Sequence, residues 1–132
     1  QFIVLEHEGR IKVFDDQDAS AQARLMWDLG AERPKLSFAP EGQSWVRLYS
    51  CAFDPDFIGN RFFYLCYVVE SPRGAKTHIS RFQIPEAKDF SIDHESELLV
   101  LQCDGGGHNG CTLAFGPDRN LYISLGDLGD AN

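Results

Sequence analysis

A strand–turn–strand pattern occurs twice in this chain and constrains its fold more than any other feature. Ala52-Phe-Asp-Pro-Asp56 leads into the aromatic run Phe62-Phe-Tyr-Leu65, and Ala114-Phe-Gly-Pro-Asp118 leads into Leu121-Tyr-Ile-Ser124. The two Ala-Phe-x-Pro-Asp segments begin 62 residues apart, at Ala52 and Ala114. A four-stranded unit repeated at about this spacing is typical of a β-propeller blade. We therefore predict an all-β chain that holds about two blades of a larger ring.

The remaining sequence also favours strands separated by turns. The predicted strands are rich in aromatic and β-branched residues, and the segments between them are rich in proline, glycine and aspartate. Gly30–Gly42 is predicted to be a loop because it holds two prolines and two glycines. The strands are expected in a hairpin over Phe2–Phe14 and at Leu25–Leu29, Trp45–Phe53, Arg61–Val69, Thr77–Pro85, Glu97–Gln102, Cys111–Phe115 and Leu121–Leu125.

Composition and charge argue against several classes of partner. The 132 residues are enough for one ordinary domain and carry a formal net charge of −8. Binding to nucleic acid or to anionic lipid needs a basic surface, so this charge disfavours both. The longest apolar run, Phe62 to Val69, has eight residues and is too short to span a bilayer. We expect no nucleic-acid partner and no membrane insertion.

Both ends of the sequence interrupt a pattern. The chain opens within the apolar strand Gln1-Phe-Ile-Val-Leu5 and stops within the turn-rich segment Gly126–Asn132. We expect a fragment of a longer protein, with part of any site outside it.

The four cysteines do not have the spacing of a zinc site. Cys51 and Cys66 lie within apolar strand patterns, where a free cysteine usually behaves as a small hydrophobic residue. Cys103 and Cys111 lie on either side of a glycine-rich loop and could be bridged. We predict that they are free, because strands beside a loop need not bring two Cβ atoms into bonding geometry.

That loop, Gly105-Gly-Gly-His108-Asn-Gly110, is the main candidate for chemistry. Glycine lets the backbone come close to a ligand, and histidine exchanges protons near neutral pH. The same residues also suit an ordinary polar turn, so both interpretations stand. A phosphate-binding loop is disfavoured because no Gly-Lys-Ser/Thr follows. The other histidines, His7, His78 and His94, are predicted to lie on the surface.

A second group of polar residues follows the last predicted strand. Asp127, Asp130 and Asn132 could offer oxygen ligands to calcium. A Gly-Asp-rich turn explains the same residues equally well.

Several motifs occur along the chain in one order, and together they resemble the soluble quinoprotein glucose/sorbosone dehydrogenase family, which includes the aldose sugar dehydrogenases. The resemblance covers essentially the whole chain. The sequence departs from the family pattern at Cys111 and Arg119, where glycines are usual. The matching segments are Glu6–Ile11, Ala52–Phe57, Asn60-Arg61, Ile79–Phe82, Gly106–Gly110, Leu113–Asp118, Leu121–Ser124 and Gly126-Asp127.

The resemblance implies a six-bladed β-propeller, with residues 1–132 forming part of that domain. It implies pyrroloquinoline quinone and calcium as cofactors, with the calcium ligands expected mostly outside this chain. The implied reaction oxidises the C1 hydroxyl of an aldose to a lactone and passes a hydride to the quinone. A separate electron acceptor would reoxidise the quinone, and the expected location is periplasmic or secreted.

The motif positions also imply roles for individual residues. His108 is expected to be the catalytic base, with Gly107 and Asn109 in cofactor binding and Gln43 in substrate binding. No metal ligand is assigned. The alternative is a non-catalytic extracellular β-propeller that binds a protein or glycan partner, because propellers support many unrelated functions.

Overall fold

The computed structural model describes residues 2–14, 22–32, 45–72, 74–86, 92–105, 107–127 and 129. Strands dominate this part of the chain, and neither short helix in it is long enough to cross a membrane. The elements are β1 (Phe2–Leu5), β2 (Arg10–Phe14), β3 (Arg24–Asp28), α1 (Leu29–Glu32), β4 (Trp45–Phe53), α2 (Phe57–Asn60), β5 (Phe62–Ser71), β6 (Gly74–Gln83), β7 (Asp93–Gly105), β8 (Cys111–Phe115) and β9 (Leu121–Leu125).

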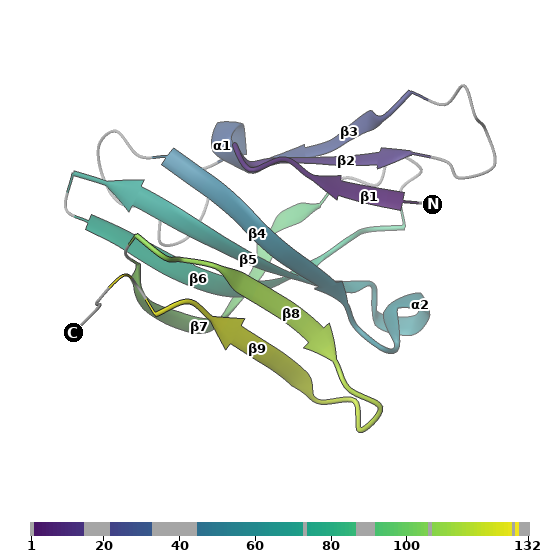
Figure 1. Ribbon diagram of the computed structural model, residues 1–132. Helices are drawn as coiled ribbons and strands as arrows, with labels where there is room; N and C mark the ends of the chain where they lie inside the picture. Colours follow the sequence, from purple (N-terminus) through teal and green to yellow (C-terminus); the bar gives the residue numbers. More distant parts are fainter. Residues whose placement is uncertain are drawn as a thin grey trace.

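The described strands form three antiparallel sheets, ordered β1-β2-β3, β4-β5-β6-β7 and β8-β9. The four-stranded sheet lies in the middle, with β1–β3 on one side and β8–β9 on the other (Figure 1). Sequential strands are neighbours in every sheet, as in a propeller blade. The chain therefore contains one complete four-stranded sheet between parts of two others.

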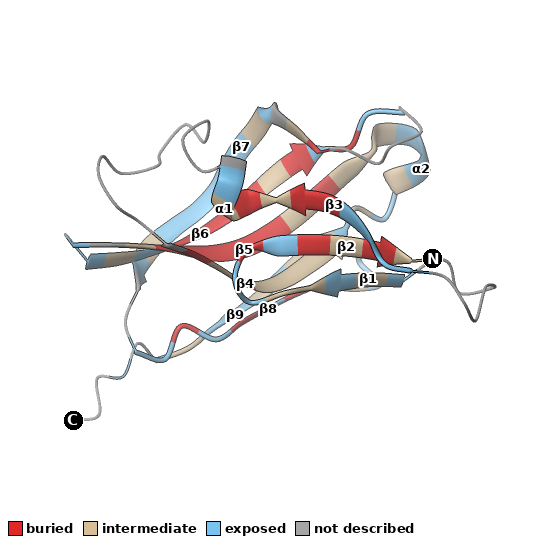
Figure 2. Cartoon of the chain, turned by 90° about the horizontal axis from the view of Figure 1, so that it is seen from above, coloured by how far each residue is buried: buried red, intermediate tan, exposed pale blue. Residues whose placement is uncertain are grey.

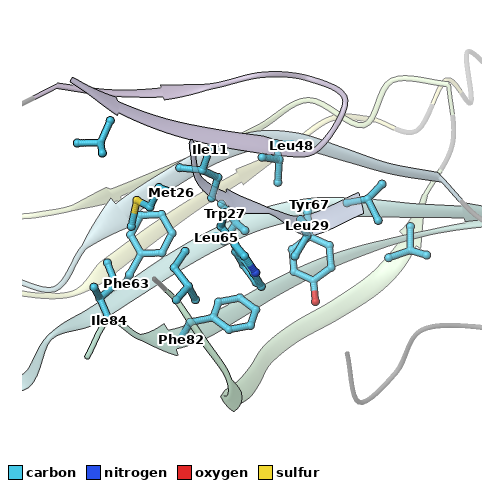
Figure 3. Packing of buried hydrophobic residues seen from close by; sticks show 14 residues of the cluster. Ile11, Met26, Trp27, Leu29, Leu48, Phe63, Leu65, Tyr67, Phe82 and Ile84 are labelled. Carbon is cyan, nitrogen blue, oxygen red and sulfur yellow. The ribbon is translucent and has the colours of Figure 1, made fainter. Parts of the chain in front are cut away.

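Alternation along β5 explains why the central sheet is covered on both faces. Successive side chains of a strand point to opposite faces. Phe63, Leu65 and Tyr67 are buried in a cluster with residues of β2 and β3, such as Ile11 and Trp27 (Figure 3). Trp27 packs edge-on against Phe82 of β6, with ring centroids 5.0 Å apart. This first cluster joins the central sheet to β1–β3.

The opposite face of β5 packs against β8. Cys66 lies in a second buried cluster with Cys111 and Leu113 of β8. Tyr64 contacts Phe115 edge-on, with ring centroids 5.3 Å apart. Burial is accordingly concentrated along β5 and β6 (Figure 2). The continuous apolar run that was too short for a bilayer is thus a strand buried on both faces.

The two Pro-Asp turns are held by the same types of side chain. In the first turn, Asp54 accepts hydrogen bonds from the side-chain amide of Asn60 at 2.8 Å and from the backbone N–H of Asp56 at 2.9 Å. In the second, Asp118 accepts bonds from the amide of Asn120 at 2.8 Å and from the hydroxyl of Tyr122 at 2.9 Å. Each turn therefore positions the following strand through an aspartate.

The structure corrects several sequence-based expectations. His78 was predicted to be a surface residue but is only 2% exposed, because β6 is an inner strand covered on both faces. Strand β7 extends beyond the predicted Glu97–Gln102 because it pairs along most of β6. Strand β6 begins at Gly74 rather than Thr77, and β5 begins at Phe62 because Arg61 caps α2. All four cysteines are free, as predicted for Cys103 and Cys111.

Candidate active site

The β8–β9 hairpin brings His108 close to the residues that follow β9. The strands pair from Phe115↔Leu121 at the turn to Cys111↔Leu125 at the open end. The backbone pairing continues one step further, because Gly126 donates its N–H to the carbonyl oxygen of Gly110 at 2.7 Å. The segment before β8 and the segment after β9 therefore lie side by side.

At this open end, His108 is paired with Asp127. The imidazole Nδ1 lies 2.9 Å from Oδ1 of the Asp127 carboxylate. The same oxygen accepts a hydrogen bond from the backbone N–H of Gly129 at 3.0 Å. Both side chains are open to solvent, with 71% of His108 and 72% of Asp127 exposed. The site is thus an oriented imidazole on the surface of this chain.

The hydrogen bonds to Asp127 favour its ionised form. The Gly129 N–H contributes most and the His108 side chain next, and together they lower the pKa of Asp127 below its ordinary value. An ionised Asp127 can accept a hydrogen bond from the Nδ1–H of a neutral His108. This tautomer leaves the lone pair of Nε2 available to take a proton from a ligand.

The glycines around His108 differ in the space that they leave. A Cβ at Gly107 would meet no protein atom within 4 Å. Gly129 has a positive φ of 79° and lies 3.9 Å from the His108 ring, measured from the position that its Cβ would take. Gly107 therefore leaves the backbone open to a ligand, whereas Gly129 allows the turn that supports Asp127.

Of the other predicted site residues, the structure describes only Asn109. Asn109 is adjacent in sequence to His108 but only 6% exposed, and it interacts within the protein. Gln43, Gly106 and the possible calcium ligands Asp130 and Asn132 lie outside the described residues. The cofactor role of Asn109 and the substrate role of Gln43 stay predictions.

The described residues bring no set of acidic side chains together around the possible calcium ligand Asp127. Within the described ranges, no group of three or more histidine, cysteine, aspartate or glutamate side chains is positioned to hold a metal ion. Asp127, which could offer oxygen to calcium, contacts His108 through Oδ1.

Sequence reasoning did not pair Asp127 with His108. The signal was present in the predicted hairpin, because strands at Cys111–Phe115 and Leu121–Leu125 bring residues 109 and 127 opposite each other if the pairing is continued. Extending that register by two steps would have placed Asp127 opposite Asn109, the neighbour of the candidate base in sequence, whereas the contact between the His108 and Asp127 side chains is seen only in the structure.

Comparison with known proteins assigns the family. The family model for Glucose / Sorbosone dehydrogenase matches residues 1–132. The chain belongs to the glucose/sorbosone dehydrogenase family. Among curated proteins, quinoprotein glucose dehydrogenase B of Acinetobacter calcoaceticus is 26% identical over 102 residues, which cover 73% of this chain and 21% of that protein. An uncharacterized protein of Synechocystis sp. is 26% identical over 132 residues, covering 97% of this chain and 30% of the relative.

A solved structure supports the same assignment for the fold. The PQQ-bound aldose sugar dehydrogenase of Streptomyces coelicolor matches with a TM-score of 0.70 and 25% identity. The match covers 97% of this chain and 35% of that protein. This glucose/sorbosone dehydrogenase chain is therefore part of an all-β propeller, and it spans about a third or less of the relatives that it matches.

Proposed function

We propose that this chain carries the catalytic base of a PQQ-dependent sugar dehydrogenase, and that His108 is this base. The observation that carries the proposal is the 2.9 Å contact between His108 Nδ1 and Asp127 Oδ1. It orients an exposed imidazole and directs the available lone pair to Nε2. The match to a PQQ-bound aldose sugar dehydrogenase supports the substrate class, an aldose, and the cofactor.

In the proposed reaction, Nε2 of His108 takes the proton of the aldose C1 hydroxyl. The developing positive charge on the imidazole is stabilised by the ionised carboxylate of Asp127. The C1–H bond breaks with loss of hydride, C1 becomes a carbonyl carbon, and the product is the lactone. Asp127 acts through His108 and is therefore a positioning residue.

The backbone at Gly107, next to His108, leaves room for a flat cofactor. The open side of Gly107 leaves room for a ring system beside the histidine backbone. When bound, pyrroloquinoline quinone supplies the hydride acceptor for this chemistry. Gly107 is the residue of this chain that would lie against it. No residue of this chain is assigned to calcium, because the described residues include no cluster of three histidine, cysteine, aspartate or glutamate side chains.

Substitutions at the pair test the proposal in the full-length protein. His108→Gln removes the base, and we expect kcat to fall roughly 10²- to 10⁴-fold with quinone binding retained. Asp127→Asn keeps the shape but weakens the orientation of the imidazole, and we expect a loss of roughly 10- to 100-fold. Asp104→Asn is the control for the charge change, because it removes the same charge from an exposed ion pair with Lys76 between β6 and β7.

The readouts are aldose-dependent dye reduction and quinone binding followed by its absorbance. Turnover of His108→Gln within a few-fold of the parent protein would reject His108 as the base and favour the non-catalytic alternative. Loss of quinone binding in the same variant would assign His108 to the cofactor site instead.

A further inference from the structure

Two cysteines meet across the interface between the central sheet and the β8–β9 hairpin. Cys66 lies in the middle of β5 and is fully buried, and Cys111 is the first residue of β8 and is 9% exposed. Their side chains belong to one buried cluster and lie close enough for each thiol to shift the pKa of the other. The chemistry proposed for His108 uses neither thiol.

A second contact fixes the register of these two sheets beside the cysteines. Ser50 of β4 is the pairing partner of Cys66 in the central sheet. Its hydroxyl oxygen accepts a hydrogen bond at 3.0 Å from the backbone N–H of Leu113, two residues after Cys111. The Ser50 side chain therefore ties the backbone of β8 to the central sheet beside the two cysteines.

The other two cysteines are placed differently. Cys51 packs against the first cluster, on the face of the central sheet that is turned toward β1–β3. Cys103 lies on β7, where it pairs with Thr77 and is half-buried. Among the four cysteines, all of which the structure describes, only Cys66 and Cys111 belong to the second cluster, and Cys103 acts on Cys66 only through its charge.

We propose that Cys66 and Cys111 form a dithiol site that a small disulfide oxidant converts into a covalent link between neighbouring sheets. The Cys111 thiolate attacks one sulfur of the oxidant, and the other oxidant sulfur leaves as a thiol after taking a proton. Cys66 then attacks the mixed disulfide at the Cys111 sulfur, and the second oxidant thiol leaves with the Cys66 proton. The two cysteines are oxidised by two electrons in total, and one oxidant disulfide is reduced to two thiols.

The environment of the pair agrees with this order of attack. The neighbouring Cys66 thiol lowers the pKa of Cys111, whereas the Cys111 thiol and burial raise the pKa of Cys66. Cys111 is also the less deeply buried of the two residues, 9% exposed against 0% for Cys66. The less buried cysteine is thus the one that ionises more readily, as expected for the attacking cysteine.

The link would act next to the proposed active site. Cys111 begins β8 three residues after His108, and the intervening Gly110 accepts the hydrogen bond from Gly126 that closes the hairpin. A Cys66–Cys111 disulfide would therefore tie the base of the His108 loop to the central sheet. The 46 residues from Cys66 to Cys111 would become a closed loop in the unfolded chain, so oxidation should also stabilise the fold.

Peptide mapping of the full-length protein tests the link directly. The protein is incubated with oxidised glutathione, its remaining thiols are alkylated in denaturant, and the peptides are analysed without reduction. We expect one linked pair of peptides containing Cys66 and Cys111, with Cys51 and Cys103 alkylated. Full alkylation of both Cys66 and Cys111, or a link from Cys111 to Cys103, would overturn the proposal.

Serine variants separate the two cysteines and add a stability readout. Cys66→Ser should leave Cys111 as a stable mixed disulfide with glutathione and should abolish any rise of Tm on oxidation. Cys51→Ser is the matched control and should keep both the linked peptides and a rise of roughly a few degrees. If Cys66→Ser and the parent protein show the same oxidant-dependent rise of Tm, the link is not responsible for it and the proposal fails.

Discussion

A side chain at Gly126 would collide with the backbone of His108: a Cβ built there lies 1.8 Å from the His108 carbonyl oxygen. The same Cβ would lie 3.1 Å from the backbone nitrogen of Gly110. The backbone of the candidate base thus packs directly against Gly126, which lies in the opposite segment of the hairpin. Its position depends on this close approach of two backbones.

Replacing Gly126 with alanine should displace the His108 loop. The added methyl group has only backbone atoms as neighbours, so the segments must separate, at a cost of roughly 1–3 kcal/mol in the free energy of unfolding. We also expect weaker aldose oxidation, because His108 would lose its position beside Asp127. Chemical denaturation and dye reduction measure the two effects. Wild-type values in both assays would show that the close contact is not required.

Gly107→Ala is the matched test of the open side of the loop. Its Cβ would meet no protein atom within 4 Å, so the free energy of unfolding should stay within about 0.5 kcal/mol of the parent value. If a cofactor lies against this backbone, the new methyl group should weaken quinone binding. A quinone titration of the folded variant measures this, and unchanged affinity would place the cofactor elsewhere.

Arg119→Gly should stabilise the second Pro-Asp turn. Arg119 is exposed and has a φ of 65°, a left-handed conformation that glycine adopts at lower cost. We expect a gain of about 0.5–1 kcal/mol, after allowing for the greater freedom of glycine in the unfolded chain. Thermal or chemical unfolding measures the gain.

The matched control for that change is Arg61→Gly. Arg61 has a similar φ of 60°, but its guanidinium stacks on the Phe57 ring at 4.7 Å and its Nε donates to the Ile84 carbonyl oxygen at 3.3 Å. Loss of these contacts should cancel the conformational gain. Equal stabilisation by both substitutions would mean that the contacts of Arg61 contribute nothing.

Buried His78 should make the fold less stable in mild acid. Burial, with a smaller contribution from the Lys76 charge, lowers the pKa of His78 to about 4 from an ordinary value of 6.5. Between these values the unfolded chain binds a proton that the folded chain does not, so acid favours unfolding. Stability should be independent of His78 above about pH 7 and fall by up to about 3 kcal/mol as the pH drops through 6.5 to 4.

His78→Phe tests the origin of that pH dependence. The substitution keeps a ring beside Tyr67, whose ring centroid lies 5.3 Å from that of His78, but removes the titrating group. The variant should lose less stability than the parent protein between pH 6.5 and 4. Parallel curves of unfolding free energy against pH would assign the acid sensitivity to other groups.

The local sequence pattern was sufficient to predict the two strands of the β8–β9 hairpin and the turn between them. The predicted strands Cys111–Phe115 and Leu121–Leu125 agree with the structure at both ends. Proline and aspartate mark the turn between them, and apolar alternation marks their buried side, so nearby residues hold the necessary information. Strand β4 was predicted with its bounds Trp45–Phe53 for the same reason.

Contacts between residues far apart along the chain determined which side chains are buried and which of them meet. Alternation on β6 did not show that His78 is buried, because its burial depends on sheets packed on both faces of the strand. Nor did it show that Cys66 meets Cys111, since that contact depends on how β8 packs on the central sheet. Strand propensity and turn chemistry act over a few residues and therefore determined the elements of this protein. Which side chains share an interface is set by packing between sheets, and only the tertiary structure decided it.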